Sequence, residues 1–176
     1  MAVASLALLA LAPSVAIANQ PTVAMLDARA RAAGNRPDIA LRVGDSIFAQ
    51  ERAAQVMQVS ANALDQHLIL GLRLSGVKFH SPLSRGEFSR EVLDLVAAAF
   101  AAEPSAEEVD VWASVPISVG KGVIVNGDLA KPTSRTVFTL TALRPDSPGD
   151  LAKRLQTGTG VYWDEDWARS AFKQGT

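Results

Sequence analysis

Hydrophobic positions recur at helical spacing near the middle of the chain. The apolar side chains follow one another at intervals of three and four residues, which places them on one stripe of a helix: Phe88, Val92, Leu95, Val96, Ala99 and Phe100. Ser84 and Glu87 have the spacing of a capping box, and Ser81 before Pro82 is a rival start. Pro104 ends the pattern, because the residue before a proline avoids helical dihedrals. We predict an amphipathic helix between these limits.

The segment before this helix alternates apolar and polar residues, which is the period of a half-buried strand. One parity of residues 67–74 carries four leucines: Leu68, Leu70, Leu72 and Leu74. Val77 and Phe79 continue the apolar signal on the opposite parity. We expect a bulge or bend at Ser75 and Gly76, because an extra residue resets which side chains point inward.

Two further strands are predicted after the helix. Residues 109–115 alternate apolar with polar positions, and residues 136–143 are rich in β-branched and aromatic side chains, which suit a pleated surface. Between them, residues 123–125 form a short apolar run bracketed by glycines, typical of an edge strand. The predicted fold class is therefore α+β: one main amphipathic helix packed on a small antiparallel or mixed sheet, with short C-terminal helices.

Those short helices are predicted from capping signals near the C-terminal end. The first begins at Ser147 and runs through Leu155, and the second begins at residues 164–166, where negative charge suits a helix N-terminus. Aromatic side chains concentrate in this segment: Tyr162, Trp163, Trp167 and Phe172. They either dock the segment onto the sheet or form an exposed patch that anchors a partner. We favour docking.

Residues 46–64 allow two interpretations that lead to different topologies. Helical spacing favours a helix, yet residues 55–61 also read as a strand. We predict a helix from Ser46 to about Ala54 and a strand thereafter. With a turn at residues 62–66, this strand forms a hairpin with the following one, which gives the order β-β-α-β-β.

The segment before this region has a weaker pattern. Residues 24–33 are expected to form a short helix that Gly34 stops, followed by a turn or linker at residues 35–37. A flexible spacer is the alternative. The predicted organisation therefore has three parts: residues 1–18 as a signal peptide, residues 19–44 as a linker or short helix, and residues 45–176 as a single α+β domain.

The first eighteen residues match a secretory signal. Residues 3–12 are apolar and uncharged, and Ala16 and Ala18 supply the small residues of a cleavage site before Asn19. No Lys or Arg precedes the apolar run, which departs from the usual signal; a buried helix or an uncleaved anchor are the alternatives. The run is short for a membrane span. We predict export to the periplasm or the extracellular space, with no membrane span in the mature chain.

Composition narrows the classes of function. The 176 residues are 48% hydrophobic and 20% charged, which suits a globular chain able to bury a core. The net charge of −1 gives no reason to expect a nucleic-acid partner, because such binding relies on clustered Lys and Arg. The chain has no cysteine, which excludes disulfides, thiol catalysis, cysteine-ligated zinc and a lipoprotein anchor.

The sequence lacks the usual catalytic and cofactor motifs. The only histidines are His67 and His80, and no HExxH cluster or G-x-S-x-G elbow occurs. The Gly120–Gly122 segment resembles part of a phosphate loop but lacks its first glycine and its Ser or Thr. We therefore expect no metal and no cofactor, and the sequence identifies no catalytic residue.

Three groups of residues are candidates for binding a ligand or a partner. Lys78, His80 and Arg85 bracket the turn into the central helix and are candidates for a basic patch, although solvated charges at a sheet edge are the favoured interpretation. The polar loop from Asn126 to Arg135, which includes Asp128, connects two strands, and loops on a rigid sheet often carry function. The third group is Trp163 and Trp167, as exposed anchors.

These observations predict an exported, non-catalytic α+β module. It would bind a partner protein, an envelope component or a small ligand. Two alternatives remain open: a small exported hydrolase whose site has no recognisable motif, and a structural subunit that adds an exposed strand to a neighbouring protein.

Overall fold

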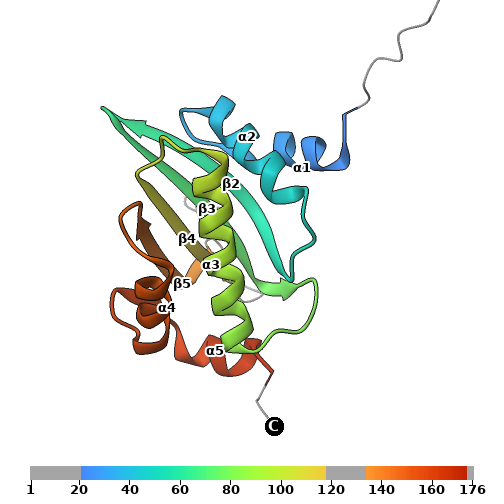
Figure 1. Ribbon diagram of the computed structural model, residues 1–176. Coiled ribbons are helices and arrows are strands. Elements are labelled where there is room, and N and C mark those ends of the chain that lie inside the picture. The colour runs from blue at the N-terminus through green and yellow to red at the C-terminus, as the bar shows by residue number, and fades with distance from the viewer. Residues whose placement is uncertain (1–20, 118–133, 174–176) are drawn as a thin grey trace, which may run out of the picture.

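The computed structural model describes residues 21–117 and 134–173, which form an α+β fold (Figure 1). Within these residues there are five helices: α1 (Val23–Arg31), α2 (Pro37–Phe48), α3 (Arg85–Ala102), α4 (Pro148–Thr157) and α5 (Glu165–Ala171). There are six strands: β1 (Ala32–Ala33), β2 (Ala54–Leu64), β3 (His67–Phe79), β4 (Glu108–Pro116), β5 (Ser134–Leu143) and β6 (Val161–Trp163).

The strands form one mixed sheet in the order of the sequence, from β1 to β6. β3 and β4 are parallel and are joined by α3, which crosses in front of the sheet in Figure 1. The hairpin β2–β3 and the pairs β4–β5 and β5–β6 are antiparallel, and β1 adds in parallel to β2. The predicted β-β-α-β-β order is therefore confirmed, with one very short strand added at each edge.

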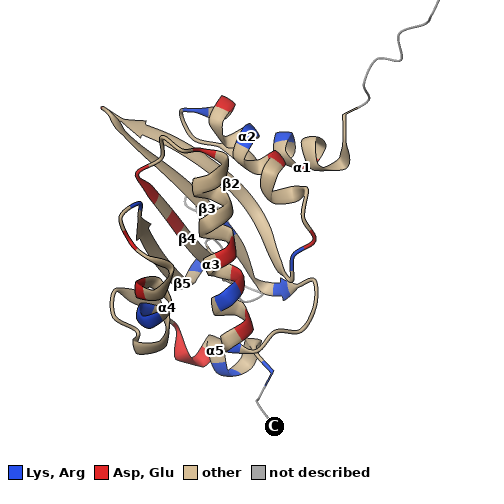
Figure 2. Cartoon of the chain, in the orientation of Figure 1, with Lys and Arg blue, Asp and Glu red and all other residues tan. Residues whose placement is uncertain are grey.

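The capping box and the buried stripe predicted for the central helix are confirmed in α3. Ser84 Oγ accepts from the backbone N of Glu87 at 3.2 Å, and the Glu87 carboxylate accepts from the backbone N of Ser84 at 2.7 Å. The rival start at Ser81 is wrong. The inward stripe is buried: Phe88, Val92, Leu95, Val96 and Ala99. Charged residues lie along the outward side of α3 (Figure 2).

The predicted bulge in β3 is present and resets its inward face. Ala54 pairs with Phe79 and Val56 pairs with Leu74. The segment of β3 between residues 74 and 79 is therefore longer than the segment of β2 between residues 54 and 56 that it faces, and the extra residues form the bulge. Phe79 packs 5.8 Å from the ring of Phe88, as its parity predicted. Val77 is 67% exposed, and its predicted inward position is wrong. The backbone N–H groups of residues 77 and 78 both donate to Ser75 Oγ, which keeps this part of the bulge outside the core.

The helix predicted at residues 46–54 lies earlier in the chain. α2 begins at Pro37 and ends at Phe48, and its buried stripe includes Ile39, Val43 and Ile47. The turn or linker predicted at residues 35–37 is confirmed for residues 35 and 36, which lie between β1 and α2. Pro37 instead begins α2, because proline suits the first helical turn, where its missing N–H would have no helical partner. The strand prediction for the second half is confirmed by β2, and the turn is tighter than predicted, with Asp65 at a φ of +55°.

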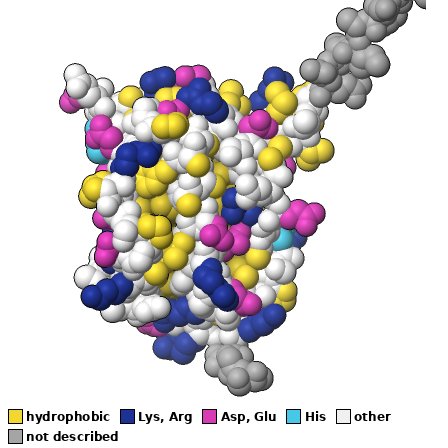
Figure 3. Space-filling model, viewed as in Figure 1, with side chains coloured by type: hydrophobic (Ala, Val, Ile, Leu, Met, Phe, Trp, Pro, Cys, Tyr) yellow, Lys and Arg dark blue, Asp and Glu magenta, His cyan; other side chains and the backbone are white. Residues whose placement is uncertain are grey.

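Residues 23–44 belong to the folded core. The short helix predicted at residues 24–33 is present as α1, and the flexible-spacer alternative is wrong. The predicted stop at Gly34 is also wrong, because α1 ends at Arg31 and residues 32–33 form β1. The domain boundary predicted at position 45 falls inside α2, which packs in the same hydrophobic core as β2 and α3. α1 lies against α2, and Gly44 permits the close approach because a Cβ there would lie 3.1 Å from Ala28 Cβ. Hydrophobic side chains reach the surface over α1 (Figure 3).

The C-terminal aromatic residues dock onto the sheet, as favoured from the sequence. Trp163 and Trp167 are buried, and Trp167 Nε1 donates to the backbone oxygen of Gly76 at 2.7 Å. The alternative of these two residues as exposed anchors is therefore wrong; Tyr162 is the exposed aromatic, at 49%. Ser147 and Asp164 cap the two predicted helices.

Several predictions fall on residues outside the described ranges. They are the signal peptide, the edge strand at residues 123–125, and the candidate residues Asn126 and Asp128. Among the helices that the structure does describe, none combines the length and hydropathy needed to cross a bilayer.

Candidate functional site

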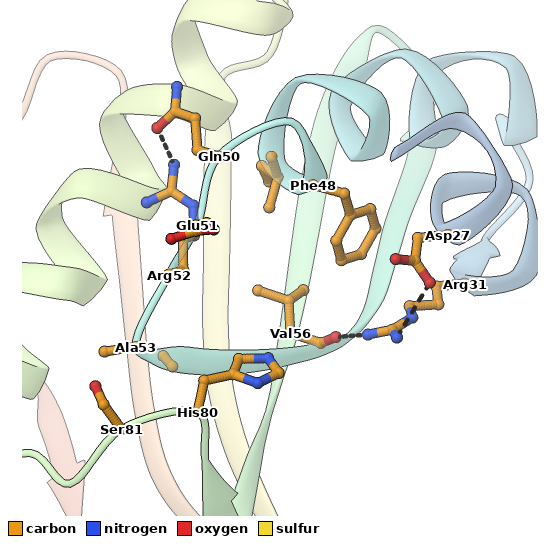
Figure 4. A pocket seen from close by; sticks show the side chains of 12 residues that line it. Asp27, Arg31, Phe48, Gln50, Glu51, Arg52, Ala53, Val56, His80 and Ser81 are labelled. Carbon is orange, nitrogen blue, oxygen red and sulfur yellow. Dashed lines mark hydrogen bonds and ion pairs between the residues drawn. The ribbon is translucent and has the colours of Figure 1, made fainter. Parts of the chain in front are cut away.

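A groove of about 610 Å³ opens where β2 begins and β3 ends (Figure 4). Three separate stretches of the chain contribute to it: the end of α1, the stretch from the end of α2 through the α2–β2 connection into the start of β2, and the residues that follow β3. Small-molecule sites in proteins typically occupy about 300–1,000 Å³. The groove is therefore large enough for a small ligand.

Arg31 forms one wall of the groove, and three partners hold its guanidinium. Nη2 lies 3.3 Å from Asp27 Oδ1, and Nη1 donates to the backbone oxygen of Val56. The guanidinium carbon also lies 5.1 Å from the ring centre of Phe48, within the range of a cation–π contact. Because Arg31 is the last residue of α1, these contacts tie the ends of α1 and α2 to the edge of β2.

Arg52 lines the groove from the α2–β2 connection and reaches towards α3. Its side chain is only 9% exposed. Nη2 donates to Gln50 Oε1 at 3.0 Å, and Nη1 lies 3.9 Å from Glu91 Oε1. Buried cations are found with a partner because an isolated buried charge is costly. Arg52 therefore helps to hold the α2–β2 connection against α3.

Glu51 and His80 are the other ionisable residues in the lining, and both are exposed. The backbone N of His80 donates to the oxygen of Ala53 at 2.8 Å, which fixes the chain after β3 beside the start of β2. Within the described ranges, the Glu51 carboxylate has neither an ion pair nor a hydrogen bond. Figure 4 shows both side chains with Phe48 and Val56, which contribute the apolar part of the lining.

Of the sequence candidates that the structure describes, His80 is the one that lines this groove. Arg85 instead makes a two-pronged ion pair with Glu165, at 3.1 Å for each nitrogen, and its guanidinium lies 4.3 Å from the ring centre of Trp163. Lys78 is exposed on the bulge of β3. The candidate basic patch is therefore divided, because the first turn of α3 directs Arg85 to α5.

The other candidates within the described residues also lie outside the groove. Arg135 forms an ion pair with Asp164, which is buried at the start of α5. Trp163 and Trp167 belong to an aromatic cluster under α3, with Phe88 at 5.9 Å from each ring. These three residues stabilise the attachment of the C-terminal segment to the sheet.

A second polar cluster lies at the opposite end of the sheet, around His67. Nδ1 is 2.5 Å from Glu107 Oε2, and Nε2 is 3.2 Å from Glu108 Oε2. Hydrogen bonds to Glu108 and then Glu107 raise the pKa of His67 above its usual value. No group of three or more His, Cys, Asp or Glu side chains in the described residues is arranged to hold a metal ion. We interpret this cluster as a surface ion pair.

The lining residues other than His80 are not predicted as site residues from the sequence, and they include Arg31, Phe48, Glu51 and Arg52. Each of these four lies near the end of a helix or in the connection that follows, and only the tertiary fold brings them together. The sequence feature that could have indicated this site is the pair of adjacent charges, Glu51 and Arg52, between two regular segments. Comparisons of the chain with protein-family models, curated proteins and solved structures find no match.

Proposed function

We propose that this protein is an exported, non-catalytic α+β module that binds a small ligand in the groove between α1, α2 and the β2–β3 end of the sheet. The observation that carries this proposal is the groove itself, with a volume of about 610 Å³ and a lining that combines Phe48 and Val56 with charged side chains. Binding sites typically combine an apolar lining with a few polar groups that orient the ligand. Export is supported by the pattern of residues 1–18 alone.

Binding fits the side chains of the groove better than catalysis does. Arg31 and Arg52 are both held by protein partners. His80 makes no side-chain hydrogen bond in the part of the chain that the structure describes, although Ser81 follows it directly. A nucleophile is activated by a base within hydrogen-bond reach. The lining therefore supports recognition of a ligand. If the ligand belongs to a partner protein or an envelope component, that molecule must present a chemical group small enough to enter the groove.

The proposal includes a role for the helices. α3 is the main structural helix, packed along the sheet through its buried stripe, and the short helices α4 and α5 close the C-terminal side. α1 and α2 form part of the groove wall near the opposite edge of the sheet, beside β2.

A fragment screen by NMR would test ligand binding with the full chain. We expect fragments that bind to shift the amide signals of residues 48–56 and 80. Ser81→Trp places a large ring at the exposed rim of the groove and should abolish these shifts. Ser134→Trp, the same substitution at an exposed position of β5 outside the groove, should leave them unchanged. Shifts that map elsewhere, or that persist in Ser81→Trp, would contradict the proposal.

A further inference from the structure

We infer that the ligand of this groove is an organic cation, such as an ammonium group on an apolar stem. This inference rests on the proposed function and names the chemical class of its ligand. It follows from which charges in the lining are already neutralised and from the direction of the two helices that end there.

The formal charges of the lining cancel, but the unpaired charge is negative. Asp27 and Glu51 are acidic, and Arg31 and Arg52 are basic. Arg31 is neutralised by Asp27 and also donates to the oxygen of Val56. Arg52 is turned towards Gln50 and Glu91, and Glu91 is not part of the lining. Among the described residues this leaves the exposed Glu51 carboxylate as the lining charge without a partner.

Two helices present their C-terminal ends to the same groove. α1 ends at Arg31 and α2 ends at Phe48, and both residues line it. The C-terminal end of a helix carries a partial negative charge, which favours a cation nearby. α1 has Arg29 and Arg31 in its last turn, but α2 has no basic residue in its own. The end of α2 therefore adds to the negative potential at Glu51, which follows it by three residues.

Apolar surface lies beside this negative region. Phe48 and Ala53 are half-buried, and the buried side chain of Val56 is drawn between them in Figure 4. An alkyl stem can cover this surface while its charged end meets Glu51, because long amphipathic groups keep their charged head in water and bury their stem. A carboxylate ligand would instead face Glu51 and the end of α2, and like charges repel.

Three probes with the same stem separate charge from hydrophobicity: n-hexylamine, n-hexanol and n-hexanoate. In NMR titrations of the full chain we expect hexylamine to shift the amides of residues 48–56 and 80, hexanol to do so more weakly, and hexanoate to have no effect. Glu51→Gln should weaken hexylamine binding by about two- to five-fold, the range of exposed ion pairs. Asp94→Asn removes a negative charge from the exposed side of α3 and should change nothing. Raising the salt concentration should weaken the wild-type interaction.

The outcomes distinguish the two proposals. Groove binding of hexanoate or hexanol at least as tight as that of hexylamine would overturn the cation inference and support the groove as a ligand site. Equal hexylamine affinity in Glu51→Gln and Asp94→Asn would also overturn it. If none of the three probes shifts the groove amides, the cation inference is overturned, and the fragment screen decides separately whether the groove binds a small ligand.

Discussion

Asn35 closes the outer edge of β2 by pairing its side chain with the backbone of Ala63. Nδ2 donates to the oxygen of Ala63 at 3.0 Å, and Oδ1 accepts from its N–H at 2.8 Å, so one side chain reproduces both bonds of a neighbouring strand. The backbone N of Arg36 also donates to the oxygen of Ala61, at 3.0 Å. Open strand edges pair with other chains. This arrangement therefore argues against assembly through the β2 edge, whereas the assembly alternative from the sequence did not specify which strand would pair.

We expect Asn35→Ala to expose this edge and to destabilise the fold. The substitution removes two hydrogen bonds, each worth about 0.5–1.5 kcal/mol. Urea denaturation should show a free energy of unfolding lower by about 1–3 kcal/mol, and sedimentation should show more self-association at high concentration. Asn35→Asp keeps the acceptor oxygen but replaces the donor with a carboxylate oxygen that faces the oxygen of Ala63, so it should not restore wild-type stability. Full wild-type stability in Asn35→Ala would show that the edge needs no such closure.

Gly34 should not tolerate a side chain. Its φ is +92°, and a Cβ at this position would clash with the backbone oxygen of Ala61. Both the left-handed conformation and this clash are unfavourable, so Gly34→Ala should lower the free energy of unfolding by about 2 kcal/mol or more. Gly86 in the first turn of α3 is the matched control, because a Cβ there would have no other atom within 4 Å. Gly86→Ala should be neutral or slightly stabilising, as judged from the same denaturation curves.

The periodic parts of the chain were predictable because their local pattern and their burial agree. The stripe from Phe88 to Ala99 and the alternation of Leu68 to Leu74 each fix one inward face within a single element. Docking of the C-terminal aromatics was predictable from their clustering. The start of α2 was missed because Pro37 suits a turn and a helix N-terminus equally well. The buried stripe that begins at Ile39 decides between them.

The groove was not predictable, because it depends on contacts between distant positions. Arg31 meets the backbone of Val56, 25 positions away, and His80 is placed by Ala53. A distant contact also removes Arg85 from the site in which the sequence had placed it. Its partner Glu165 lies 80 positions further on, so no local pattern could separate Arg85 from the candidate basic patch.

The indole N–H group of Trp167 should matter more for stability than that of Trp163. Trp167 Nε1 donates to the oxygen of Gly76, whereas Trp163 Nε1 is buried with no hydrogen-bond partner in the described structure. Trp167→Phe leaves the Gly76 oxygen unpaired and should lower the free energy of unfolding by about 1–3 kcal/mol beyond the loss from ring size. Trp163→Phe removes an unpaired donor and should be less harmful. Equal losses in urea denaturation would contradict this ranking.

His67 should make the stability of the protein depend on pH. Glu108 and Glu107 raise the pKa of His67 in the folded state above its usual value of 6.5, because they stabilise the imidazolium. The folded state therefore holds this proton more tightly than the unfolded state does. The resulting stabilisation is fully present below about pH 6.5, while the two carboxylates are still ionised, and it is lost as the pH rises through the raised pKa of the folded state.

We expect the melting temperature of wild type to exceed that of His67→Asn by more at about pH 6 than at about pH 9. His80→Asn is the matched control, because His80 has no ion pair in the described residues, and its difference from wild type should not follow this trend. Glu108→Gln removes the first of the two partners and should reduce the pH dependence without abolishing it, since Glu107 remains. A gap between wild type and His67→Asn that stays constant, or that widens as the solution becomes more alkaline, would show that the His67 cluster does not stabilise the fold through its charge.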